Sequence, residues 1–515
     1  MLRALRNLYR LARIAWTLAR HDALILFEMA GIAPGVIELG RRMARPQPAL
    51  GLHSRAGQRL ALALEELGPS FIKLGQILST RSDLIGDEIA GDLASLRDNL
   101  PPFPAAEARA IIAEELGEPI ESLYLSFDDA PVAAASIAQV HFAVTADGKE
   151  VAVKVLRPGV AEAFARDLDL FYWLGELIER WRPQLRRLRP LDVAEALAQS
   201  VALEMDLRYE AAAASELRDN FHDDPGFLVP EVDWRRTAKR VLTIARIAGI
   251  AMDRRAELVA AGHDIDAILT RAANAFFLQV FRDGFFHADL HPGNMFVADS
   301  GAIVVIDFGI MGRLDRKTRD YLAEMLVGFV TRDYRRVAEV HFRAGYVPPS
   351  KSMDAFTQAC RSIGEPILGK PLHEISIARL LGQLFKITEQ FDMQIQPQLL
   401  LLQKTMLVAE GVGRKLNPNV NMWEMARPLI EDWMLRKQAP DQRLRAFVED
   451  ARDNLERLPR LLADTERAAQ AILEGGIKLS PETIRTLRGE DATRVSWPLV
   501  IAIIALALAV IALAW

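Results

Sequence analysis

The chain has 515 residues, of which 50% are hydrophobic and 25% are charged. This composition can bury a large core and excludes a disordered, collagen-like or disulfide-stapled protein, and the length allows three or four domains. The 63 basic and 68 acidic residues leave a net charge of −5, so the whole chain offers no basic field for a nucleic acid. Cys360 is the only cysteine, which excludes an internal disulfide and a cysteine-based zinc site.

Helices are predicted in residues 1–48. Arginines interrupt every apolar stretch near the N-terminus, so the pattern of a signal peptide is missing. They follow one helical stripe and are Arg3, Arg6, Arg10, Arg13 and Arg20. A basic amphipathic helix of this kind suits an anionic membrane surface, and the alternative is a helix packed against the domain behind it. The sequence leaves both interpretations open.

A second helical region is predicted over 49–123. It contains Lys73 and Gln76, which share one helical face because they are three residues apart. Long helices are also predicted from 160 to about 222, and these carry Glu204, Asp206 and Glu210. A kinase-like site needs one helical glutamate to hold a strand lysine. For both clusters the plain alternative is a solvated charged face.

A β-rich zone is predicted between the two helical regions, near 124–157. The turn Asp147-Gly148 predicts a hairpin that pairs 137–144 with 151–155. On the second strand Lys154 points away from the side of its two valine neighbours, so its ammonium can reach the phosphates of a nucleotide. Alone, the same pattern fits a surface lysine on an alternating strand.

The glycine-rich loop G-x-G-x-x-G is absent before these strands. Its place is taken by the run Ala133, Ala134, Ala135 and Ser136. Backbone N–H groups of this run can still bind phosphate, but the Cβ atom of alanine disfavours positive φ angles. We therefore predict a stiffer loop that binds a nucleotide differently. Gly411 and Gly413 lack a third glycine and are not interpreted as such a loop.

The strongest chemical signal lies between 286 and 309. Asp289 is followed five positions later by Asn294, which is the spacing of a kinase catalytic loop, and Asp307-Phe-Gly309 follows. The segments 295–297 and 303–306, joined by a turn at 298–301, predict a tight hairpin that brings Asn294 beside Asp307. Two oxygen ligands there suit Mg²⁺ on a nucleotide, with Asp289 placed near the reacting phosphoryl group.

This segment also allows two alternatives to phosphoryl transfer. An isolated Asp-Phe-Gly can occur by chance, and His287, Asp289 and His291 have the residue types of a transition-metal site. Neither alternative predicts the ordered series of Asp289, Asn294, a hairpin and Asp307, so phosphoryl-transfer chemistry is favoured.

A membrane anchor is predicted at 495–515, a run of 21 residues without a charge. About 20 apolar residues in a helix cross the hydrocarbon layer of a bilayer. Trp497 and Trp515 lie near its ends, where indole rings prefer the headgroup region. Arginines just before the run place the preceding domains in the cytoplasm and are Arg485, Arg488 and Arg494. A buried core helix is the alternative.

Taken together, these motifs resemble those of the UbiB family of atypical kinases, over residues of about 49 to 435. The motifs occur in the family's order: Lys73-x-Gly75-Gln76, the loop 133–136, Val-Ala-Val-Lys154, Glu204-x-Asp206, the segment 287–294, and Asp307-Phe-Gly309. One departure is Ala245, where the family usually has a glutamate at the hinge between lobes. This departure bears on nucleotide preference more than on binding.

The resemblance implies an α+β, protein-kinase-like fold of two lobes, with an N-terminal helical extension over the site where a protein substrate would dock and a C-terminal transmembrane helix. It implies that Lys73 engages Glu204 and Asp206, and that Glu210 pairs with Lys154. The implied order is N-terminal helices (1–48), the extension (49–123), an N-lobe (124–245), a C-lobe (246–435), a helical region (436–494) and the anchor (495–515).

The leading functional hypothesis is an ATPase or small-molecule or lipid kinase that uses ATP and Mg²⁺ and supports ubiquinone synthesis at the cell inner membrane. The resemblance implies membrane lipids, quinone-precursor lipids and ubiquinone-biosynthesis proteins as partners, and no nucleic acid. Lys154 would hold phosphates, Asp289 would orient or deprotonate the nucleophile, and Asn294 and Asp307 would hold the metal. The alternatives are a conventional protein or small-molecule kinase and a nucleotide-sensing scaffold without turnover.

Overall fold

The computed structural model describes residues 2–23, 55–79, 85–93, 96, 101–181, 190–366, 387–388, 390–393 and 396–419. The chain divides into two units, Met1–Ile430 and Glu431–Trp515, and all the described residues belong to the first. The predicted helical region 436–494 and the predicted anchor 495–515 lie outside the described residues. Within the described part, no helix combines the length and the apolar character needed to span a bilayer.

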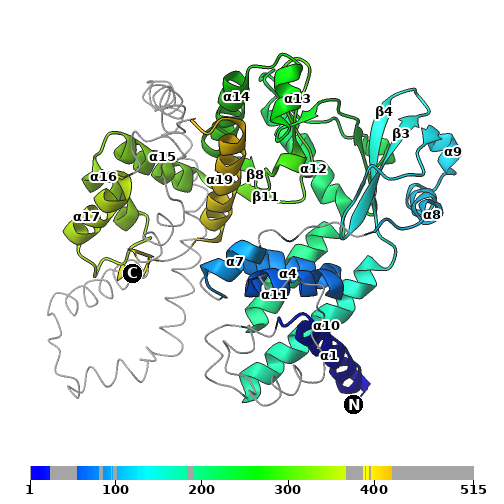
Figure 1. Ribbon diagram of the computed structural model, residues 1–515, viewed down its shortest axis with the longest axis horizontal. Helices are drawn as coiled ribbons and strands as arrows, with labels where there is room; N and C mark the ends of the chain where they lie inside the picture. The colour runs from blue at the N-terminus through cyan, green and yellow to red at the C-terminus, as the bar shows by residue number, and fades with distance from the viewer. Residues whose placement is uncertain are drawn as a thin grey trace, which may run out of the picture. The chain divides into compact units, whose positions relative to one another are not determined.

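An antiparallel sheet forms the first β-rich layer (Figure 1). Its strands run in the order β1-β3-β4-β6, and β2 also pairs with β3. The predicted hairpin at Asp147-Gly148 is confirmed, with Lys154 paired to Val140 across it. The strand bounds are β1 Tyr124–Phe127, β2 Ala133–Ala134, β3 Ala138–Thr145, β4 Glu150–Leu156 and β6 Val241–Ala245.

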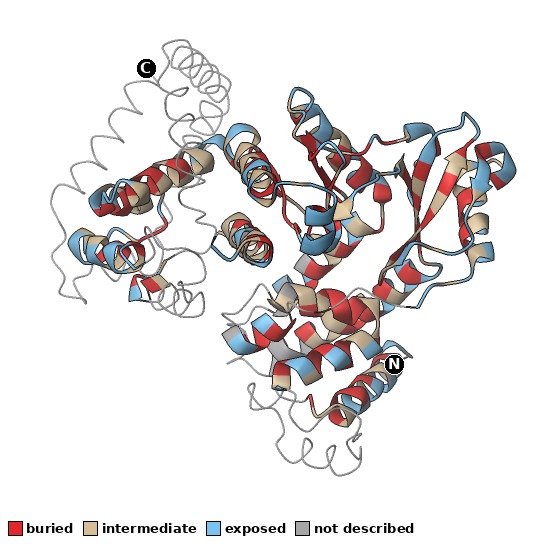
Figure 2. Ribbon diagram, turned by 45° about the horizontal axis from the view of Figure 1, so that its top comes forward, coloured by how far each residue is buried: buried red, intermediate tan, exposed pale blue. Residues whose placement is uncertain are grey.

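The two faces of β4 have different surroundings because side chains alternate along a strand. The valines of β4 are buried against the short helices α8 (Ala105–Leu116) and α9 (Ile120–Leu123), and the buried sides of these elements are visible in Figure 2. Lys154 therefore points to the opposite face of the sheet, as the alternation predicted.

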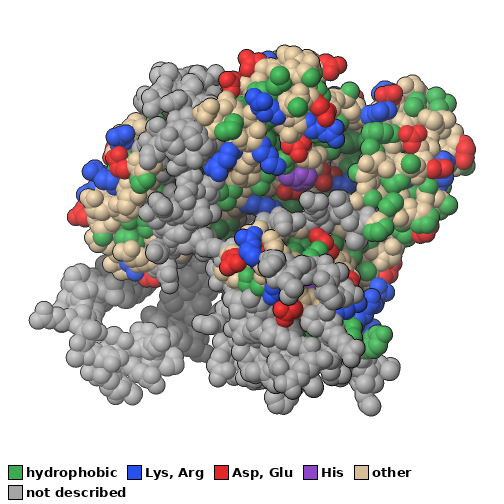
Figure 3. All heavy atoms as spheres, in the orientation of Figure 1, with side chains coloured by type: hydrophobic (Ala, Val, Ile, Leu, Met, Phe, Trp, Pro, Cys, Tyr) green, Lys and Arg blue, Asp and Glu red, His purple; other side chains and the backbone are tan. Residues whose placement is uncertain are grey.

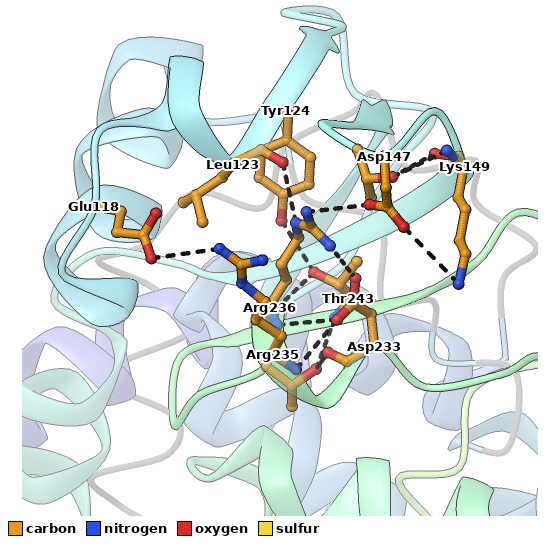
Figure 4. Close-up of polar contacts among 11 residues, drawn as sticks. Glu118, Leu123, Tyr124, Asp147, Lys149, Asp233, Arg235, Arg236 and Thr243 are labelled. Carbon is orange, nitrogen blue, oxygen red and sulfur yellow. Dashed lines mark hydrogen bonds and ion pairs between the residues drawn. The ribbon is translucent and has the colours of Figure 1, made fainter.

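A buried arginine ties the end of this sheet to the segment before β6. Arg236, in the short helix η2 (Trp234–Arg236), is only 5% exposed. It donates to the carbonyl oxygen of Leu123 at 3.0 Å and to Asp233 at 2.6 Å, and its other nitrogen lies 3.2 Å from Asp147 (Figure 4). Because the buried charge is met by two carboxylates, the network orders the hairpin turn and the start of β6.

The helices before the sheet pack with the two long helices after it. The helices α4, α5, α7 and α10 surround a shared apolar core that also includes Ile14 and Leu18 of the N-terminal helix, and α11 packs against α10. The bounds are α1 Leu2–Arg20, α4 Ala56–Leu67, α5 Pro69–Ser79, α7 Asp87–Leu93, α10 Val160–Trp181 and α11 Pro190–Glu204.

The N-terminal helix α1 uses its arginines within the protein. Arg3 and Arg6 each lie 2.7 Å from Asp169, and Arg10 lies 2.8 Å from Asp167, both acidic residues of α10. Arg20 pairs with Glu66 of α4. Of the two interpretations that the sequence left open, the structure therefore supports the packed helix, although Tyr9 and Trp16 remain exposed on its outer side.

The second half of the described chain is mainly helical around short strands. A four-stranded sheet has the order β5-β10-β9-β7, and β8 pairs with β11. The strand bounds are β5 Phe227–Leu228, β7 Ile250–Ala251, β8 Phe285–His287, β9 Met295–Val297, β10 Ile303–Val305 and β11 Met311–Arg313. The predicted hairpin of β9 and β10 is confirmed, whereas the parallel pairing of β5 with β10 had no signal in the sequence.

The helices of this half bury the short strands and extend beyond them. The helix α12 begins at Asp206, whose carboxylate accepts from the N–H of Arg208 and caps it. The last described helix, α19, lies against β11. The helix bounds are α12 Leu207–Asn220, α13 Arg255–Ala260, α14 Ile265–Phe277, η3 Leu278–Asp283, η4 Pro292–Asn294, α15 Arg316–Val330, α16 Tyr334–Arg343, α17 Met353–Gly364 and α19 Pro397–Leu416.

Candidate active site

The structure brings Lys154 between two carboxylates that are distant in the sequence. Its Nζ donates to both oxygens of Glu210, at 2.8 and 2.9 Å, and to Oδ1 of Asp307 at 3.1 Å. The Lys154 and Glu210 side chains are 18% and 9% exposed, whereas that of Asp307 is 47% exposed. The inner carboxylate therefore anchors the lysine, and the outer one faces the solvent side of the site.

The charges of this cluster shift one another's protonation. Lys154 lowers the pKa of Asp307 to about 2, so this carboxylate is ionised at neutral pH. Burial raises the pKa of Glu210 to about 7, against the opposing effect of Lys154. Burial alone would lower the pKa of Lys154, but Asp307 and Glu210 outweigh it and raise that pKa. The site therefore holds a positive lysine beside an ionised Asp307.

The hairpin of β9 and β10 positions both predicted metal ligands. Asn294 precedes β9 and accepts, through its backbone oxygen, from the N–H of Ile306 at 3.0 Å. Asp307 is the next residue and has a φ of 63°, in the left-handed region that aspartate tolerates better than most side chains. The hairpin thus brings Asn294 opposite the residue before Asp307, which is the juxtaposition that the sequence predicted.

Asp289 lies at the end of a tight, backbone-bonded turn. Its carbonyl oxygen accepts from the N–H of His291 at 2.9 Å and from Nδ2 of Asn294 at 3.1 Å. Its own N–H donates to Nδ1 of the buried His287 at 3.2 Å. The catalytic candidate and the metal-ligand candidate Asn294 are therefore joined by a direct hydrogen bond.

His287 supports this turn as a neutral ring. Its Nε2 lies 3.1 Å from the carbonyl oxygen of Ile306, so Nε2 carries the proton and Nδ1 accepts from Asp289. Burial lowers the pKa of His287. Because both ring nitrogens contact the backbone, His287 is not available as a metal ligand. Among the described residues no group of three His, Cys, Asp or Glu side chains is arranged to hold a metal ion.

The donor set at the hairpin fits a hard cation on a phosphate. An ionised Asp307 and the amide oxygen of Asn294 are oxygen ligands, and Mg²⁺ in nucleotide sites takes one or two such ligands together with phosphate oxygens. The amide nitrogen of Asn294 is used by Asp289, which leaves the amide oxygen as the group able to meet a cation.

Lys73 and Glu204 form an ion pair between α5 and α11. Their side chains are 11% and 14% exposed. The expected contact of Lys73 with Asp206 is not formed: the carboxylate of Asp206 is bound instead by the guanidinium of Arg208, at 2.6 and 2.8 Å. The physical reason is that Asp206 caps α12, so its side chain is turned toward the first turn of that helix.

Gln76 lies one turn beyond Lys73 on α5 and is half-buried. Between them, Gly75 allows close packing, since a Cβ atom there would lie 2.8 Å from Leu64 Cδ1 and would also contact Leu96. The motif therefore has a packing role in addition to the Lys73–Glu204 pair.

The alanine-rich loop is partly strand. Ala133 and Ala134 form β2, and the N–H of Ala135 donates to Ala138 at 2.7 Å. The carbonyl oxygen of Ala135 accepts a hydrogen bond from Nε of Arg157 at 2.9 Å. Ser136 is buried. The N–H group of Ala135 is therefore used within the turn. The predicted phosphate contacts of the loop would have to come from its other N–H groups.

Two site residues had no signal in the sequence. Thr405 of α19 is buried, and its Oγ1 lies 3.2 Å from the carbonyl oxygen of Ala288, 117 residues away. The same hydroxyl also lies 2.9 Å from the carbonyl oxygen of Leu401 in its own helix. Beside it, Lys404 Nζ lies 3.9 Å from Oδ1 of Asp289. Figure 3 shows histidine, acidic and basic side chains gathered on this face near α12 and β11.

Comparison with known proteins identifies the family and the fold. Residues 95–341 match the ABC1 atypical kinase-like domain, and residues 360–421 match the UbiB helical domain. A solved structure, the complex of Rv3197 with erythromycin from Mycobacterium tuberculosis, is similar with a TM-score of 0.52 and 27% identity. The similarity covers 73% of this chain and 95% of that chain. The kinase-like α+β fold that the resemblance implied is thereby confirmed.

Relatives named "Probable protein kinase UbiB" match most of the chain. The protein of Marinobacter nauticus is 42% identical over 463 residues, which cover 88% of this chain and 84% of that protein. The protein of Pseudomonas aeruginosa is 43% identical over 470 residues, which cover 88% of each chain. That of Aeromonas hydrophila is 45% identical over 419 residues, which cover 80% of this chain and 77% of that protein. The chain therefore belongs to the UbiB family of atypical kinase-like proteins.

Proposed function

We propose that this protein is an ATPase or a small-molecule or lipid kinase that uses ATP with Mg²⁺ and supports ubiquinone synthesis at the inner membrane. The observation that carries the proposal is the bonded series Glu210–Lys154–Asp307, joined through one hairpin to Asn294 and Asp289. A positive lysine, two oxygen ligands and a separate carboxylate are the parts that phosphoryl transfer requires.

Each residue has a distinct task in this proposal. Lys154, fixed by Glu210, binds the α- and β-phosphates of the nucleotide. Asp307 and Asn294 hold Mg²⁺, which when bound neutralises charge that develops on the phosphoryl oxygens. Asp289 accepts the proton of the attacking water or hydroxyl and orients its oxygen. His287 keeps the backbone of Asp289 in place.

The N-terminal helical extension (49–123) bears on which molecule accepts the phosphoryl group. The Lys73–Glu204 pair fastens α5 to α11, and the family resemblance puts this extension where a protein substrate would dock. This favours water, a small molecule or a quinone-precursor lipid over a protein substrate, although the relatives carry the name of protein kinases. The proposed location rests on the apolar segment 495–515, and the proposed lipid partners rest on the family resemblance.

The test of metal binding compares nucleotide affinity in the wild type and in Asp307→Asn, with and without Mg²⁺. We expect Asp307→Asn to lose Mg²⁺-dependent ATP binding, because the charged ligand is replaced by a neutral one. Asp299→Asn, at the exposed tip of the same hairpin, is the matched control and is expected to bind as the wild type does. Wild-type affinity in Asp307→Asn would overturn the assignment of the metal site.

The test of turnover measures phosphate release from ATP with vesicles that contain quinone-precursor lipids. We expect the wild type to release phosphate, lipid to stimulate it, and Asp289→Asn to reduce the rate by about 100-fold or more, in the range that a general base contributes. A wild type that binds Mg²⁺-ATP but releases no more phosphate than Asp289→Asn would instead favour the nucleotide-sensing scaffold.

A further inference from the structure

The helix α19 is fixed directly against the segment that carries Asp289. Thr405 is fully buried, and its hydroxyl lies 3.2 Å from the carbonyl oxygen of Ala288 and 2.9 Å from that of Leu401, so the two oxygens share its one proton. Three residues earlier on the same helix, Leu402 packs in an apolar cluster with Phe286 and Ala288. A buried hydrogen bond and a buried apolar contact on the same turn define where the neighbouring side chains of α19 point.

This docking places Lys404 beside the carboxylate of Asp289. The distance from Lys404 Nζ to Asp289 Oδ1 is 3.9 Å, and the lysine side chain is 32% exposed. On the other oxygen of the same carboxylate, Nε2 of His291 also lies at 3.9 Å. Both distances exceed that of a direct hydrogen bond, so the carboxylate keeps its acceptor capacity toward a substrate.

The N–H donors of the Lys404 ammonium also remain available for a ligand. Among the described residues none accepts a hydrogen bond from its ammonium, and Asp289 is its ion-pair partner. Lys154 differs in this respect, because Glu210 takes it at 2.8 and 2.9 Å. The site thus has one lysine bound tightly on the side of Asp307 and a second lysine, with donors to spare, on the side of Asp289.

We infer that Lys404 is a further catalytic residue, which binds the terminal phosphoryl group of the nucleotide. This inference rests on the proposed function. In the reaction, the bond from the terminal phosphorus to the bridging oxygen breaks, and a new bond forms to the acceptor oxygen, whose proton passes to Asp289. Lys404 stays protonated throughout and donates to phosphoryl oxygens, where its charge is most valuable as negative charge develops.

The alternative is that Lys404 only orients Asp289, and the two roles differ in nucleotide binding. A residue that contacts the terminal phosphoryl group discriminates ATP from ADP, whereas a residue that only orients Asp289 does not. We therefore measure the Kd of the full-length protein for ATP and for ADP, each with Mg²⁺, in the wild type, Lys404→Met and Lys404→Arg.

We expect Lys404→Met to weaken ATP binding by at least about 10-fold, as the loss of a charged hydrogen bond predicts, and to leave ADP binding within about 2-fold. Lys404→Arg, which keeps the charge, should retain most of the preference for ATP. Lys415→Met is the matched control, because this exposed lysine lies on the same helix without a recorded partner among the described residues.

The inference fails if Lys404→Met binds both nucleotides as the wild type does, or weakens both equally while its thermal unfolding is unchanged. If Lys404→Met unfolds, Lys404→Gln takes its place, because it also removes the charge. A lower preference for ATP over ADP in that variant supports the contact, and an unaltered ATP-to-ADP ratio overturns it. Failure of the proposed function looks different, because the wild type itself would then bind neither nucleotide.

Discussion

At the scale of single residues, the position of Asp289 depends on the fully buried imidazole ring of His287. His287 receives the N–H of Asp289 on one nitrogen and donates from the other to Ile306, the residue before Asp307. One neutral imidazole therefore holds together the two ends of the hairpin that carries the candidate site. A proton on Nδ1 would remove the acceptor and place a positive charge in a buried position, where desolvation outweighs the attraction of Asp307 and Asp289.

This arrangement predicts a pH dependence of stability. Because burial lowers the pKa of His287 from 6.5, the unfolded chain binds more protons than the native one at pH values between the two. The free energy of unfolding should therefore fall as the pH is lowered below about 6.5. We expect His287→Gln to weaken this dependence, as measured by urea unfolding at pH 7.5 and pH 5.

The exposed His222 supplies the control for this measurement. His222→Gln should lose stability between the two pH values as the wild type does. An identical loss in His287→Gln and in the wild type would contradict the neutral, acceptor role assigned to His287.

At the scale of elements, the extension is joined to the kinase-like part through α5 and α11. The Lys73–Glu204 pair is largely removed from solvent, unlike the exposed pair of Lys149 and Asp147, whose side chains are 69% and 53% exposed. An ion pair in such surroundings becomes costly when one member is removed, because the other stays buried as a charge.

A double-mutant cycle tests this coupling. We expect Lys73→Met and Glu204→Gln each to lower the free energy of unfolding by about 3 kcal/mol, and the double variant to lose less than the sum, with a coupling of about 2 kcal/mol. The control cycle of Arg254→Met and Glu257→Gln, a pair whose side chains are 62% and 56% exposed, should give less than about 1 kcal/mol. Additive losses at Lys73 and Glu204 would show that the pair does not fasten the extension.

At the scale of the whole molecule, two segments compete as the membrane-binding element in the sequence. Four of the five arginines of α1 are paired with acidic residues of α10 and α4, which reduces the positive charge that this helix offers to anionic lipids. The apolar run 495–515 lies outside the described residues. Its interpretation as a membrane anchor rests on its length and on its lack of charged residues.

Deleting 495–515 is therefore expected to move the protein from the membrane fraction to the soluble fraction of a cell lysate. The comparison variant is the full-length chain with Tyr9→Ser and Trp16→Ser, which alters the exposed side of α1 and should stay with the membrane. If the deletion variant sediments with membranes and only the change at Tyr9 and Trp16 releases it, α1 is the anchor instead.

The sequence by itself determined the local parts of the site. The Asp147-Gly148 turn, the alternation around Lys154 and the hairpin between Asn294 and Asp307 depend on short-range rules of turn geometry and side-chain alternation, and the structure reproduces all three. The family resemblance added Glu210 as the partner of Lys154 and Glu204 as the partner of Lys73. Each glutamate is distant in the sequence from the lysine that it contacts.

Tertiary structure alone decided the contacts between distant segments. Asp206 turned to Arg208 because it begins a helix, and the arginines of α1 found acidic partners on α10. Lys404 reached Asp289 because a buried threonine and a buried leucine dock α19 against the catalytic segment. The hydrophobic periodicity of the sequence does not predict such a contact, because docking depends on which apolar surfaces fit together in three dimensions. That fit exists only in the folded chain.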